Sequence, residues 1–161
     1  MNGPAHMAAG LCCGVAAAAV ASATVGGVLA ATAGSLAAAK LPDIDRQGDS
    51  SYNHRSLTHS ALIAVPALVV MAYLLPYEQL PAALAAVARL AAVGFVAGYA
   101  SHLVLDALTP KRIPLLGKHG PRVGLSLVNT KKASGKAIEL AVIAGSPVAA
   151  LVIFANVWGG L

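Results

Sequence analysis

Acidic and histidine side chains gather in one short segment between long apolar runs, residues 40–60, which we call the polar island. It contains three of the six acidic residues and two of the five histidines of the 161-residue chain. Carboxylates and imidazoles beside hydrocarbon-rich segments are costly to remove from water unless something compensates them. A divalent cation would do so, and the island is therefore predicted to form half of a metal site. Its candidate residues are Asp43, Asp45, His54, Arg55 and His59.

A second pair of such residues, His102 and Asp106, is spaced by four positions. In a helix this spacing places both side chains on one face. It suits two ligands of one metal, or one ligand and the carboxylate that orients it. The pair alone also fits a hydrogen-bonded contact between helices, so metal binding is predicted from its convergence with the polar island.

The composition is that of a membrane protein. Apolar residues make up 58% of the chain and charged residues only 11%, and the mean hydropathy is +0.75, unlike an ordinary soluble domain. We expect an all-α, polytopic membrane bundle that forms a single domain over residues 1–161. Cys12 and Cys13 are adjacent in an apolar run and cannot form a disulfide framework. Packing is their expected role, with palmitoylation or metal ligation as alternatives.

The apolar runs predict about five helices. The run from residue 7 to 39 is too long for one span of about 20 residues, and the small residues from Ser22 to Gly27 suit a turn. The first two helices should therefore form a short hairpin. Gly94 and Gly98 should let a neighbouring backbone approach the fourth helix closely. The expected helices are 7–21, 27–40, 60–75, 82–108 and 137–158, with a basic, membrane-proximal loop over 111–136.

Antiparallel passage of these helices would bring the candidate residues to one side of the membrane. The hairpin returns to the side where it began, the third helix leaves from the polar island, and the fourth comes back to it. Imidazoles with carboxylates suit zinc, with manganese or iron as alternatives, and this many ligands allow one to three ions. The residues expected to converge are His6, Asp43, Asp45, His54, His59, His102 and Asp106.

Basic residues predict the orientation. On this topology ten of the eleven Lys and Arg residues lie on the side of the polar island, and only Arg89 lies elsewhere. The positive-inside rule makes that side cytoplasmic. We therefore expect the N-terminus inside the cell (inner) membrane and the C-terminus outside it.

Three further residues have roles that the sequence leaves open. One of His54 and His59 is expected to bind metal while the other acts on substrate. Arg55 either pairs with the carboxylates or clamps an anionic group. Glu139, in the first turn of the fifth helix, is a further ligand or general base, or else a charge that the helix dipole favours.

The order of these motifs resembles that of a known family. Leu-Pro-Asp-Ile-Asp at 41–45 is followed by His-Arg-Ser-Leu-Thr-His-Ser at 54–60, by Gly-Tyr-Ala-Ser-His-Leu-Val-Leu-Asp-Ala-Leu-Thr-Pro at 98–110 and by Ile-Pro-Leu-Leu at 113–116. The combination is similar to the bacterial membrane-bound metal-dependent hydrolase family of the YdjM type. It also resembles the spacing in the all-helical zinc-dependent phospholipase C superfamily. That second resemblance implies that the metal ligands are His6, Asp45, His59, His102 and Asp106, with Glu139 as a weaker match.

The residues and the resemblance together lead us to expect hydrolysis of a phosphoester in a lipid or lipid-linked substrate, at the cytoplasmic membrane face. A metal-activated water would attack, Asp43 or Glu139 would take its proton, and Arg55 would steady the developing charge. The expected partners are membrane lipid and a phosphorylated lipid-like substrate, and no nucleic acid. The alternatives are a non-enzymatic protein with a structural or sensing metal site, and a metal-ion transporter. Transport is disfavoured because the helix centres are almost free of ionisable residues.

Overall fold

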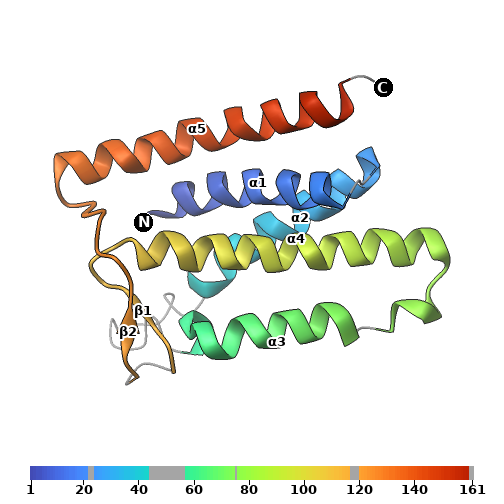
Figure 1. Ribbon diagram of the computed structural model, residues 1–161, viewed down its shortest axis with the longest axis horizontal. Helices are drawn as coiled ribbons and strands as arrows, with labels where there is room; N and C mark the ends of the chain where they lie inside the picture. The colour runs from blue at the N-terminus through green and yellow to red at the C-terminus, as the bar shows by residue number, and fades with distance from the viewer. Residues whose placement is uncertain (22–23, 44–56, 75, 117–119, 160–161) are drawn as a thin grey trace.

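Long antiparallel helices form the body of the molecule (Figure 1). The computed structural model describes residues 1–21, 24–43, 57–74, 76–116 and 120–159. Its α-helices are α1 (Gly3–Val20), α2 (Val25–Lys40), α3 (Ala61–Leu74), α4 (Ala82–Ala107) and α5 (Ala133–Trp158). Two short 3-10 helices, η2 (Leu57–His59) and η3 (Tyr77–Gln79), precede α3 and α4. The predicted all-α bundle of about five helices is confirmed.

Among the described residues, four helices are long and apolar enough to cross a membrane, namely α1, α2 with the turn that follows it, α4 and α5. α3 has 14 residues, about 21 Å at 1.5 Å per residue, which is shorter than a typical hydrocarbon core of about 30 Å. Large apolar side chains such as Leu29, Leu84 and Leu151 are exposed on the outside of the bundle, as expected where lipid surrounds the helices. The chain is a multi-pass membrane protein.

The α1–α2 hairpin is confirmed, although its turn lies earlier than predicted. Thr24 caps α2 by accepting a hydrogen bond from the Gly27 backbone at 3.3 Å. Because this cap starts the helix at Val25, Gly26 and Gly27 lie in its first turn and not in the connection between the helices.

Glycines bring α2 and α4 into backbone contact. A Cβ on Gly94 would lie 1.9 Å from the Ala31 carbonyl oxygen, and a Cβ on Gly98 would lie 2.1 Å from that of Ser35. No larger residue fits such an approach, so the closeness predicted for these two glycines is confirmed. The contact runs from the middle of α2 and α4 toward the end of the bundle that carries the histidines.

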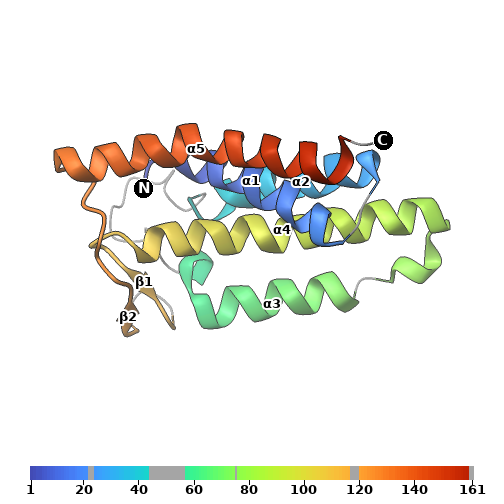
Figure 2. The same ribbon diagram turned by 45° about the horizontal axis from the view of Figure 1, so that its top comes forward.

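α5 packs along α1, on the opposite side of the bundle from α3 (Figures 1 and 2). Its far end joins an apolar cluster that contains Val15, Val28 and Trp158. The helix begins at Ala133, four positions before the predicted start. Glu139 therefore lies in the second turn of α5, and its expected position in the first turn is wrong.

The basic loop between α4 and α5 contains a small hairpin. β1 (Ile113–Pro114) pairs antiparallel with β2 (Arg122–Val123), with Ile113 opposite Val123. A backbone hydrogen bond of 3.4 Å from Leu62 to the Leu115 carbonyl fastens this hairpin to the start of α3.

Candidate metal centre

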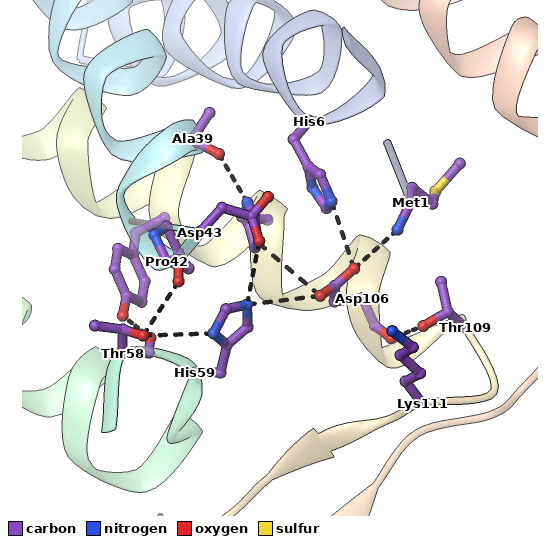
Figure 3. A network of polar contacts seen from close by, with 12 residues as sticks. Met1, His6, Ala39, Pro42, Asp43, Thr58, His59, Asp106, Thr109 and Lys111 are labelled. Carbon is purple, nitrogen blue, oxygen red and sulfur yellow. Dashed lines mark hydrogen bonds and ion pairs between the residues drawn. The ribbon is translucent and has the colours of Figure 1, made fainter. Parts of the chain in front are cut away.

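Candidate side chains from four parts of the chain converge at the end of the bundle where α1 begins and α2 and α4 end (Figure 3). Two overlapping groups, His6 with Asp43 and His102, and His59 with His102 and Asp106, each have possible ligand atoms within 4.8 Å of one another. The convergence expected from the topology is therefore present for the residues that the structure describes. Three other predicted site residues lie outside the described residues, namely Asp45, His54 and Arg55.

Four of these side chains, Asp43, His59, His102 and Asp106, form a closed arrangement that we call the His/Asp ring. His59 Nε2 lies 3.9 Å from Asp43 Oδ1 and 3.7 Å from Asp106 Oδ2. His102 Nε2 lies near the same two oxygen atoms, 3.9 Å from Asp43 Oδ1 and 4.0 Å from Asp106 Oδ2. Nitrogen and oxygen thus alternate around the ring.

The orientation of His102 is set by the end of α2. Its Nδ1 lies 2.7 Å from the Ala39 carbonyl oxygen. A carbonyl only accepts, so Nδ1 donates and, in the neutral imidazole, Nε2 directs its lone pair into the ring. This Nε2 is buried and has no hydrogen-bond partner among the described residues.

His59 is oriented in the same sense by Thr58. The Thr58 hydroxyl donates its single hydrogen to the Pro42 carbonyl at 3.1 Å, so toward His59 Nδ1, 3.4 Å away, it can only accept. His59 Nε2 then also presents a lone pair to the ring. Tyr99 of α4 donates a hydrogen bond to the Thr58 carbonyl and so fixes η2 beside the ring.

Four acceptor atoms therefore face one another in a largely buried space. A doubly protonated imidazole could satisfy the carboxylates, but such charge-assisted hydrogen bonds are about 2.7–2.9 Å long, and the shortest separation in the ring is 3.7 Å. A cation among the four atoms would be attracted by all of them at once. The spacing favours that solution.

The dimensions of the ring fit a small divalent metal. Zinc bonds imidazole nitrogen and carboxylate oxygen at about 2.0–2.2 Å, which places neighbouring ligand atoms of a tetrahedral shell about 3.3–3.6 Å apart. The observed edges of 3.7–4.0 Å would have to contract by only a few tenths of an ångström. Two nitrogens with two oxygens suit zinc, and they also suit manganese or iron.

The other oxygen of Asp106 carries a separate set of contacts. The Met1 amino group donates to Oδ1 at 2.9 Å, and His6 Nε2 lies 3.4 Å from the same atom. The His6 ring stacks on His102 with 3.7 Å between the centroids. His6 thus lies against the ring but outside it, and Asp106 links the two groups of polar side chains.

Glu139 approaches from α5. Its Oε1 accepts a hydrogen bond of 2.5 Å from the Asn2 backbone, next to the Met1 amino group that contacts Asp106. The residue as a whole is 9% exposed and counts as buried. Glu139 therefore belongs to the outer part of the same polar cluster.

Sequence reasoning missed the residues that orient the imidazoles. The Ala39 carbonyl has no signature in a sequence, because every residue carries one. Two signals were available: Thr58 precedes His59 directly, and Tyr99 lies three positions before His102 on one face of α4.

These features define a class, a multi-pass α-helical membrane protein with a candidate metal centre at one end of its bundle. The family model for YdjM inner membrane protein matches residues 1–159, nearly the whole chain. The chain belongs to this family. No curated protein and no solved structure matches it.

Proposed function

We propose that this protein is a membrane-bound, metal-dependent hydrolase that cleaves a phosphoester in a lipid or lipid-linked substrate. The proposal joins the family resemblance, with its distant likeness to zinc-dependent phospholipases C, to the chemistry that the His/Asp ring supports. It assigns zinc as the metal, with manganese or iron as alternatives.

The single observation that carries the proposal is the uneven burial of the ring. The side chains of His59 and His102 are 0% exposed and that of Asp106 is 3% exposed, whereas that of Asp43 is 23% exposed. Catalytic zinc sites typically have three protein ligands and keep one position open. His59, His102 and Asp106 supply three buried ligands, and the fourth corner is the accessible one.

His59, His102 and Asp106 would hold the metal, which would supply Lewis acidity toward a phosphoryl oxygen and toward the attacking water. Asp43, at the accessible corner, accepts the proton of the attacking water. Ala39 and Thr58 hold the two imidazoles with their lone pairs toward the centre. These orienting contacts, buried for His102 and partly buried for His59, keep the donor set fixed during the reaction.

Other polar residues have supporting roles in the proposal. Glu139 is the second candidate base, or a ligand together with His6, from the α5 side of the cluster. From the sequence, Arg55 steadies charge on the phosphoryl group, and His54 acts on the substrate. Asp45 is the ligand that the superfamily resemblance implies.

The place of the centre favours a lipid substrate. It lies at the end of the long apolar helices and not midway along them (Figure 1). In a bilayer this end is near the level of the headgroups, where the phosphoester of a lipid or lipid-linked substrate is found. By the distribution of basic residues this is the cytoplasmic face.

One observation favours a second candidate, a structural or sensing metal site without catalysis. The His/Asp ring offers four ligand atoms at similar spacing, and four protein ligands that complete a tetrahedral shell are typical of structural zinc. In that case Asp43 is a ligand and not a base.

The test compares bound metal and hydrolysis in the purified protein and its variants in detergent. His59→Ala, His102→Ala and Asp106→Ala should each lose metal, measured by elemental analysis. Asp43→Asn should keep metal while hydrolysis falls by about 100-fold or more, since a general base typically contributes 10²–10⁴-fold. The substrates are phosphomonoester and phosphodiester lipids, with a soluble aryl phosphate for comparison.

Ser101→Ala is the matched control. Ser101 precedes His102, but its hydroxyl bonds the Gly98 carbonyl of its own helix at 2.8 Å, so its removal should leave metal and activity unchanged. Unchanged metal in all three ligand variants would refute the site. If the parent binds metal but hydrolyses no phosphoester, or if Asp43→Asn loses metal, the structural candidate replaces the hydrolase.

A further inference from the structure

Exposed apolar side chains stand on the segment that follows β1 and includes β2, residues 122–128, which we call the strap. Val123, Leu125 and Leu127 are 41%, 70% and 68% exposed. They alternate with less exposed residues: Gly124 lies against α4, and Ser126 accepts a hydrogen bond from Arg112 Nε at 3.1 Å on the surface. Every second residue of the strap from Val123 to Leu127 is therefore an exposed apolar one.

The strap is fastened to the end of α4. The Leu125 backbone donates to the Ala107 carbonyl at 2.9 Å, and the Val128 backbone donates to the Leu108 carbonyl at 2.9 Å. A Cβ on Gly124 would lie 2.3 Å from the same Ala107 oxygen. These contacts begin one residue after Asp106, so the leucines are held outward by a backbone that is fixed beside the metal centre.

The position of this hairpin suits a membrane surface. In both views the strands lie at the end of the bundle that carries the metal centre, and they run across the direction of the helices (Figures 1 and 2). If the helices cross the bilayer, a segment with this direction lies along the interface between headgroups and acyl chains.

The charges beside the strap are all of one sign. Lys111, Arg112 and Arg122 are exposed, and Arg122 Nη1 donates to the Lys111 carbonyl at 3.1 Å. Between residues 107 and 138 the sequence contains no Asp or Glu. Cations beside exposed leucines match a surface that is apolar below and anionic above.

We propose that the strap, with Lys111, Arg112 and Arg122, is an interfacial binding surface for anionic phospholipids of the bilayer that the helices cross. The leucines enter the boundary between headgroups and acyl chains, and the cations bind lipid phosphates. A second copy of the chain fits the surface poorly, because a symmetric contact would bring two sets of cations together. The proposal depends on membrane insertion and not on hydrolysis.

Depth measurements with single fluorescent labels test this surface. In a Cys12→Ala, Cys13→Ala background, Leu125→Cys carries an environment-sensitive label, and Lys132→Cys provides a control position at the same end of the bundle. The full chain is placed in vesicles of phosphatidylcholine, alone or mixed with phosphatidylglycerol. The Leu125 label should be quenched by nitroxide lipids and shielded from iodide about threefold or more relative to Lys132, with stronger shielding when phosphatidylglycerol is present.

Arg122→Gln tests whether the charge of Arg122 contributes to lipid binding. Glutamine removes one of the three cations and keeps a polar side chain, so this variant should weaken the dependence on phosphatidylglycerol while its bound metal is unchanged. Equal iodide access at Leu125 and Lys132 in both membranes would overturn the proposal. The proposal would also be overturned if shielding of the Leu125 label depended on the protein-to-lipid ratio and not on the lipid charge. That result would identify a second copy of the chain as the partner of the strap. Neither result changes bound metal or hydrolysis, so this proposal and the hydrolase proposal fail separately.

Discussion

His102 Nδ1 donates a hydrogen bond of 2.7 Å to the carbonyl oxygen of Ala39, and so joins α4 to the C-terminal end of α2. Ala39 is the penultimate residue of α2, and the last four carbonyls of a helix lack partners within it. This one contact therefore gives a carbonyl at the end of α2 a hydrogen-bond partner. It also fixes which imidazole nitrogen of His102 faces the His/Asp ring. The His/Asp ring is thereby tied to the packing of α4 against α2.

Gly98→Ala should weaken metal binding from a distance. The added Cβ would lie 2.1 Å from the Ser35 carbonyl oxygen, so α2 and α4 must separate, at a cost of about 1–3 kcal/mol in stability. Separation lengthens the contact between His102 and Ala39, and loss of such an orienting contact lowers metal affinity by about 10–100-fold. Competition with a fluorescent chelator measures the affinity.

Gly145→Ala is the matched control for that variant. A Cβ on Gly145 meets nothing within 4 Å, so the same substitution in α5 should change neither stability nor affinity. Equal effects of the two substitutions would show that the α2–α4 contact has no special relation to the centre.

Thr58→Val should lower metal affinity by about tenfold or more, because His59 Nδ1 loses its acceptor while the side-chain volume is kept. Thr58→Ser keeps the hydroxyl, with its 3.1 Å bond to the Pro42 carbonyl, and should bind metal as the parent does. The measurement is again competition with a chelator. If the valine and serine variants bind metal equally well, the inferred orientation of His59 is wrong.

The helices could be predicted because apolar runs and their proline and glycine boundaries are local features of the sequence. The boundaries failed where glycine served packing and not a turn. Gly135 is typical of a loop, yet it lies inside α5, where a Cβ would stand 1.9 Å from the Asn129 carbonyl oxygen. Whether a glycine makes a turn or a close contact depends on a neighbour that only the folded chain supplies.

The residue types of the centre were predictable for a similar reason, since histidine and carboxylate are unusual beside apolar helices. The sequence did not predict which of these side chains would form the His/Asp ring and which would lie outside it. The His/Asp ring depends on which oxygen of Asp106 faces inward, and that choice follows from contacts with Met1 and His6 on the other oxygen. Contacts across a hundred residues or more leave no pattern along the chain.

Metal removal should destabilise the folded bundle. A ligand that binds only the folded state at 100 times its dissociation constant stabilises that state by about 2.7 kcal/mol, and a chelator removes this contribution. Thermal unfolding in detergent should therefore occur at lower temperature after chelation, and added zinc should restore it. His102→Ala should unfold at the same temperature with and without chelator. A chelator effect of full size in that variant would mean that the stabilising metal binds elsewhere.

The His/Asp ring should lie at the cytoplasmic face of the membrane. Moving a loop with many cations across the membrane is disfavoured, and the exposed Lys131 lies in such a loop, whereas Glu78 lies in η3 at the opposite end of the bundle. In the background without native cysteines, Lys131→Cys should react with a membrane-impermeant reagent only after the inner membrane is opened. Glu78→Cys should react when that membrane is intact. The reverse pattern would put the His/Asp ring on the outer face, where a cytoplasmic lipid-linked substrate could not reach it.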